Sequence, residues 1–146
     1  MLITADQLVA HAIGDYVLQS DWMAQQKTKN GIPATVHALV YSLVFVVWFR
    51  PSFHAWAIIY VTHFLIDRYR LARFVVWAKN FLAPKSTESP TDMFGGSDTF
   101  VWWYPWKECS GTGYHKDRPA WLSVWLLIIA DNVMHVLING FALRFG

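Results

Sequence analysis

The 146-residue chain has few charged residues and almost no cysteine. Only 15% of its residues are charged, against about a quarter in soluble domains, whereas 55% are hydrophobic. Its one cysteine, Cys109, excludes a disulfide framework and a thiolate cluster for zinc. The formal net charge of +2 provides no basic surface for nucleic acid, which we exclude as a partner. These absences favour a membrane protein, and the length favours a single domain.

Charged residues are missing from three long stretches. None occurs between Gly31 and Phe49, and Asp131 is the only one between Pro119 and Leu143. Helices of this length cross the apolar layer of a bilayer. A third uncharged run reaches from Ser52 to Asp67 and leads into a basic amphipathic extension. The first segment is more polar, but its polar residues fall on one helical stripe that can face a bundle interior.

The expected fold is therefore an all-α, membrane-embedded bundle of four helices in a single integral membrane domain, residues 1–146. The predicted helices cover about residues 2–20, 33–49, 53–80 and 119–143, and an irregular connector covers 84–118. The first helix either spans the membrane or re-enters it. No basic residue precedes Lys27, which is not typical of a cleaved signal peptide.

The basic residues gather on one side of this predicted bundle. Ten of the twelve Lys and Arg residues lie there, and only Arg50 and Arg144 lie on the other. Because basic loops remain on the cytoplasmic side, we expect a multi-pass protein of the bacterial inner membrane with connector 84–118 in the cytoplasm. Membrane lipid is then an expected partner, and a chain this small can complete its buried surface as a homo-oligomer.

One pairing of residue types recurs in the most apolar segments. Each pair places an imidazole and a carboxylate four residues apart, on one face of a helix. Since an ionised carboxylate in hydrocarbon costs on the order of 3 kcal/mol, these acids need partners. The pairs can be each other's partners, but together with one further histidine they favour a metal site. The candidate ligands are His11, Asp15, His37, His63, Asp67, Asp131 and His135.

Seven candidate ligands exceed the four that a tetrahedral ion takes. Either two ions share bridging carboxylates, or one ion is surrounded by acids that orient its histidines. Nitrogen and oxygen ligands without thiolate favour a divalent metal, zinc first and manganese or iron as alternatives, over copper(I). Gln19 and Asn132 are candidates to hydrogen-bond to the ligands from outside.

These motifs resemble a family of small bacterial and phage membrane proteins that is catalogued only as domain of unknown function 3307. The resemblance rests on the segments HAIGDYVLQSDWMAQQK, VHALVYS, HFLID and DNVMH. It covers nearly the whole chain except the connector, which is longer here, and Asn132 stands where the family usually has Gln. A more distant similarity to membrane-bound metal-dependent hydrolases implies hydrolysis without identifying a substrate.

Two functions from different classes are compatible with these residues. In the first, an intramembrane metal site activates water to hydrolyse a lipid headgroup or phosphate ester, with Asp15, Asp67 and Asp131 as catalytic ligands or general base. In the second, the protein is not an enzyme. Its His–Asp pairs then act as the relay of an ion or proton conduit, or as interhelical contacts of a phage–host interaction module.

Overall fold

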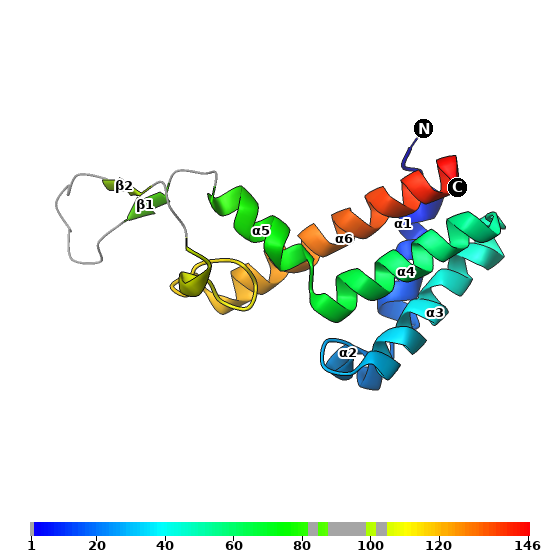
Figure 1. Ribbon diagram of the computed structural model, residues 1–146, viewed down its shortest axis with the longest axis horizontal. Helices are drawn as coiled ribbons and strands as arrows, with labels where there is room; N and C mark the ends of the chain where they lie inside the picture. The colour runs from blue at the N-terminus through cyan, green and yellow to red at the C-terminus, as the bar shows by residue number, and fades with distance from the viewer. Residues whose placement is uncertain (1, 82–84, 88–98, 102–104) are drawn as a thin grey trace. The chain divides into compact units, whose positions relative to one another are not determined.

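The computed structural model describes residues 2–81, 85–87, 99–101 and 105–146 (Figure 1). The regular elements in these parts are helices, apart from one short antiparallel pairing of β1 (Lys85–Thr87) with β2 (Thr99–Val101), and residues 109–119 form turns with an isolated bridge between Cys109 and His115. The expected all-α class is confirmed at this level. Much of the expected connector, including residues 88–98 and 102–104, lies outside the described residues.

The helices belong to two compact units, Met1–Leu71 with Asp131–Gly146, and Ala72–Ala130. The first unit contains α1 (Ala5–Ala12), η1 (Ile13–Val17), α2 (Asp21–Gln26), α3 (Gly31–Phe49), α4 (Phe53–Tyr69) and the C-terminal part of α6 (Ala120–Phe145). The second contains α5 (Ala72–Phe81), the two strands, η2 (Trp106–Glu108) and the N-terminal part of α6. Within the first unit, α3 and α4 lie side by side as a helical hairpin (Figure 1).

The segment expected as one helix over residues 2–20 ends earlier and changes type. Thr4 begins α1 with a capping box, in which its side chain accepts from the backbone of Gln7 and the Gln7 side chain accepts from the backbone of Thr4. The helix then widens into the π-helical turn η1, which contains Asp15. Ser20 caps α2, a separate short helix. Turns of the π type are rare and often occur at functional sites.

The helix expected over residues 53–80 is two helices, α4 and α5. Arg70 adopts the left-handed conformation, with φ 52°, and ends α4. Its backbone N–H donates to the carbonyl oxygens of Asp67 and Ile66. Arg50 closes α3 in the same way, with φ 49°. Left-handed Arg is uncommon because its Cβ is crowded there, and the sequence gives no signal for it of the kind a glycine would give.

Within the described residues, two helices, α3 and α6, are long and apolar enough to cross a membrane. α4 has 17 residues, which extend over about 26 Å, and α1 has eight. A complete bundle of four membrane-spanning helices therefore stays a prediction.

The first unit buries polar side chains beside an apolar core and exposes large apolar side chains. Its centre contains the fully buried His37 and His63 beside an apolar cluster around Tyr41 and Phe45. Its outer face exposes large apolar side chains, such as Val47 at 79%. Buried imidazoles together with exposed large apolar side chains are compatible with helices that face lipid and enclose a polar centre.

The second unit contains a small apolar contact on α5. Ala72 and Val76 are buried, and the ring of Phe74 stacks on Trp106 of η2 at a centroid distance of 5.0 Å. Gly113 has φ 83° and lies against the backbone of Arg73, where a side chain would not fit. The loop that contains Gly113 therefore packs closely against the backbone of α5.

Gly14 allows the π-turn to lie against Tyr41. A Cβ at Gly14 would lie 2.5 Å from Tyr41 Cδ2, whereas a Cβ at Gly31 would meet nothing within 4 Å. We expect Gly14→Ala to destabilise the protein by about 1–3 kcal/mol through overpacking and Gly31→Ala to have little effect. Thermal unfolding in detergent, followed by tryptophan fluorescence, measures the difference. Equal melting temperatures for the two variants would contradict this packing.

Candidate metal centre

Four buried side chains from three elements converge inside the first unit. η1 provides Asp15, α3 provides His37, and α4 provides His63 and Asp67. Each offers one ligand atom, and these atoms all lie within 4.8 Å of one another. The four side chains are at most 9% exposed. We refer to these four residues as the buried group.

Five of the six distances between the ligand atoms are close to those of a tetrahedral site. His37 Nε2 lies 3.1 Å from Asp15 Oδ1 and 3.1 Å from Asp67 Oδ2. His63 Nε2 lies 3.4 Å from Asp15 Oδ1 and 3.1 Å from Asp67 Oδ2. The two Nε2 atoms are 3.0 Å apart. Because zinc ligands at about 2.0–2.1 Å in a tetrahedron are about 3.3 Å from each other, one ion fits these spacings.

A second group shares Asp67 and adds Asp131 and His135 from α6. His135 Nε2 lies 3.4 Å from Asp131 Oδ2 and 3.7 Å from Asp67 Oδ1. Asp67 therefore turns Oδ2 toward the buried group and Oδ1 toward this one. The side chain of Asp131 is 27% exposed, so we refer to these three residues as the outer group.

Lys27 brings a positive charge to the buried group. Its Nζ lies 2.8 Å from Asp67 Oδ2 and 3.3 Å from His37 Nε2. Arg68 holds the same loop by donating to the backbone carbonyl of Thr28 at 2.7 Å. Asp67 is in the last turn of α4, where the helix dipole disfavours a carboxylate, so it depends on a cation. Sequence reasoning missed this contact, because nothing in the sequence around Lys27 indicates which acid it meets.

His11, a predicted ligand, belongs to neither group. Its Nε2 lies 2.6 Å from Asn132 Oδ1 and its Nδ1 lies 2.8 Å from the hydroxyl of Tyr41. Asp15 Oδ2 is further away, at 3.5 Å from Nε2. The structure therefore brings six of the seven predicted ligands together and places His11 beside them, and its role as a ligand stays a prediction.

The two predicted outer hydrogen-bond donors behave differently. Asn132 accepts from His11 and exchanges hydrogen bonds with Tyr16. Gln19 has a buried Oε1 without a hydrogen-bond partner among the described residues. The link from Asn132 to the ligands therefore runs through His11.

Tyr41 is a residue of the site that sequence reasoning missed. Its ring stacks on His63 at 3.7 Å between centroids and 18° between planes, and its hydroxyl accepts from Asn139. Tyr41 follows His37 by four residues on α3, which puts both side chains on one helix face. This spacing could have identified Tyr41 from the sequence as a neighbour of the site.

The second ring nitrogens of the two histidines in the buried group lack hydrogen bonds to described residues. Nδ1 of His37 and Nδ1 of His63 have no hydrogen-bond partner within the part of the chain that the structure describes. Metal-bound histidines usually donate from this atom. Here burial and the Tyr41 stack hold the His63 ring instead, and Nε2 is the atom of each ring that faces the carboxylates.

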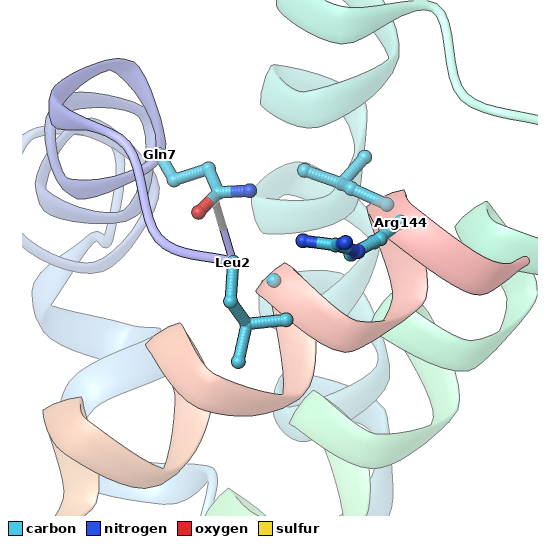
Figure 2. Close-up of a pocket in the computed structure, with 5 residues that line it drawn as sticks. Leu2, Gln7 and Arg144 are labelled. Carbon is cyan, nitrogen blue, oxygen red and sulfur yellow. The ribbon is translucent and has the colours of Figure 1, made fainter.

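A separate pocket of about 280 Å³ lies in the same unit (Figure 2). Leu2 and Gln7 line it from the N-terminal segment, and Arg144 lines it from the last turn of α6. Gly140 and Leu143 complete its lining. It contains no member of the buried or outer group, so it is not the pocket of the candidate centre.

Comparison with known proteins adds one relationship. A family model described as Protein of unknown function (DUF3307) matches residues 3–88. The chain belongs to this family. The DUF3307 match contains every member of the buried group and ends before Asp131 and His135. No protein of curated function and no solved structure gives a significant match, so hydrolysis stays a prediction.

The position of Lys27 makes a prediction about metal affinity. Its ammonium contacts two of the four ligand atoms, so its charge opposes a divalent ion in the buried group. We expect Lys27→Met to lower the dissociation constant for zinc by about tenfold or more. Competition with a chromophoric chelator in detergent measures it. Lys29→Met, an exposed change of the same charge, is the control. Equal affinities in both variants would contradict the prediction.

Proposed function

We propose that this protein is a multi-pass metalloprotein of the bacterial inner membrane that hydrolyses a lipid headgroup or a phosphate ester. The observation that carries the proposal is the convergence of two imidazoles and two carboxylates, at metal-ligand spacing, inside a unit with an apolar exterior. The buried and outer groups are compatible with a metal site in a membrane protein, and the chemistry is our inference from them.

The apolar exterior supports the membrane location. α3 and α6 have the length and composition of membrane spans. Val133 and Phe141 on α6 are 52% and 53% exposed, which suits contact with lipid tails better than contact with water. The excess of basic residues on one side supports a cytoplasmic location for the connector 84–118. Membrane lipid is then both the surroundings and the nearest source of substrate.

Charge balance supports a divalent cation. The two groups contain three carboxylates, whereas Lys27 provides one ammonium beside them. Buried charges are stable when they are paired or bound to metal. With only nitrogen and oxygen ligands the set suits zinc, and manganese or iron as alternatives.

Hydrolysis is the reaction that such a site performs most directly. A divalent ion lowers the pKa of a bound water toward neutrality and polarises a phosphoryl oxygen. The water loses a proton to a carboxylate, for which Asp15, Asp67 and Asp131 are the candidates, and its oxygen bonds to phosphorus. The bond between phosphorus and the ester oxygen breaks, and the leaving alcohol takes up a proton.

The His–Asp pairs favour a second candidate function, a proton conduit without hydrolysis, because an imidazole and a carboxylate can exchange a proton. A hydrogen-bonded network from Tyr16, which is 58% exposed, through Asn132 to His11 leads from the surface toward these pairs. In this function, protons on the histidine Nε2 atoms satisfy the carboxylates without an ion. The metal content of the protein separates the two functions.

We expect protein purified in detergent without chelators to contain at least one equivalent of a divalent metal, measured by inductively coupled plasma mass spectrometry. Asp67→Asn should lose most of it, because Asp67 belongs to both groups and the amide removes the charge while preserving volume. Asp21→Asn, an exposed change of the same kind, should retain it. Release of alcohol or phosphate from lipid vesicles should follow the metal content. If the wild-type protein contains no metal, the hydrolase proposal is wrong and the proton conduit replaces it.

A further inference from the structure

We propose that the two groups hold two divalent ions bridged by the Asp67 carboxylate, and that the ion of the outer group takes the water and the phosphate. This inference rests on the proposed metal-dependent function. It assigns the reacting position within that function, and it narrows the substrate to a phosphate ester.

Asp67 has the geometry of a bridging ligand. Its Oδ2 lies 3.1 Å from the Nε2 atoms of both His37 and His63, whereas its Oδ1 faces His135 Nε2 at 3.7 Å. A carboxylate that gives one oxygen to each ion is compatible with the spacing of about 3.5–4 Å found in two-metal sites. The same side chain therefore serves both groups without any rearrangement of α4.

The position of His135 Nε2 between two carboxylates points to an ion in the outer group. His135 is 1% exposed, and its Nε2 has no hydrogen bond within the described residues. Buried polar atoms without a partner are rare in native proteins. The distances from this nitrogen to Asp131 Oδ2 and to Asp67 Oδ1 are 3.4 and 3.7 Å, which suit two ligands of one ion better than a hydrogen bond.

The number of protein ligands distinguishes the two positions. The buried group supplies four, which is typical of a closed structural site. The outer group supplies three, as catalytic sites do, and leaves a position for water. Asp131 is also more exposed than any ligand of the buried group, at 27% against 9% or less. Water and substrate therefore reach the outer ion, and the buried ion anchors Asp67.

The substrate class follows from having two ions. A pair of ions bridged by a carboxylate can bind two oxygens of one phosphoryl group and neutralise the charge that develops during in-line displacement. A carboxylic ester has one carbonyl oxygen to polarise and gains less from a second ion. Phosphate esters are therefore favoured, and lipid headgroups and soluble phosphates share this chemistry.

Metal stoichiometry and spin coupling test the inference together. Wild-type protein loaded with manganese(II) should bind two equivalents and show an exchange-coupled electron paramagnetic resonance signal in place of that of isolated ions. Asp131→Asn should bind one equivalent without coupling, and Asp21→Asn should behave as wild type. Inorganic phosphate should change the coupled signal. Vesicles containing phosphatidic acid and a soluble phosphate monoester are then compared, which distinguishes a lipid headgroup from a soluble phosphate as the substrate.

The failures of the two proposals differ. Wild-type protein with one equivalent and an uncoupled signal, or a variant Asp131→Asn that retains two equivalents, would overturn the two-ion centre and leave the metal-dependent function standing. A coupled signal that inorganic phosphate does not change would overturn the assignment of the substrate class. Protein without any metal would overturn both proposals. Because the wild-type signal is measured on unaltered protein, a variant that fails to fold does not prevent the decision.

Discussion

The burial of carboxylates is the constraint on which the first unit depends. Asp15 and Asp67 lie inside it, where an uncompensated charge costs several kcal/mol. Compensating groups come from separate elements, with Lys27 after α2, His37 on α3 and His63 on α4. Each of these groups would be unfavourable in its place alone. Together they tie the helices to one another, so the polar centre fixes the packing as much as the apolar cluster around Tyr41 does.

Features that depend on local spacing could be predicted from the sequence. The uncharged runs predicted the helices that became α3 and α6, because length and composition are properties of a single segment. The interval of four residues placed His63 with Asp67, and Asp131 with His135, because helical periodicity needs no tertiary information. The family relationship, all-α class and two apolar helices are confirmed. The single domain and the four spans stay predictions.

Features that depend on long-range contacts or on rare backbone conformations could not be predicted. A shared carboxylate was one of the alternatives, but that it is Asp67 depends on segments far apart in the sequence meeting. The contact of Lys27 is of the same kind. The division of the expected helix at Arg70 depends on a left-handed residue that is not glycine, and the earlier end of the first helix depends on a π-turn. Propensity and periodicity carry no information on any of these.

The π-turn at Ile13–Val17 makes the centre sensitive to chain length in an unusual way. A regular α-helix covers the same rise with about one residue fewer, so deletion of one residue here would restore ordinary helical hydrogen bonding. The deletion would also change the direction of the side chains before the turn relative to Asp15. His11 would then leave Asn132 and Tyr41, its two hydrogen-bond partners. Deletion of one residue would therefore stabilise the helix and disrupt the hydrogen bonds of His11 beside the site. The extra residue of the π-turn lowers helix stability, so it would be retained only because the site needs it.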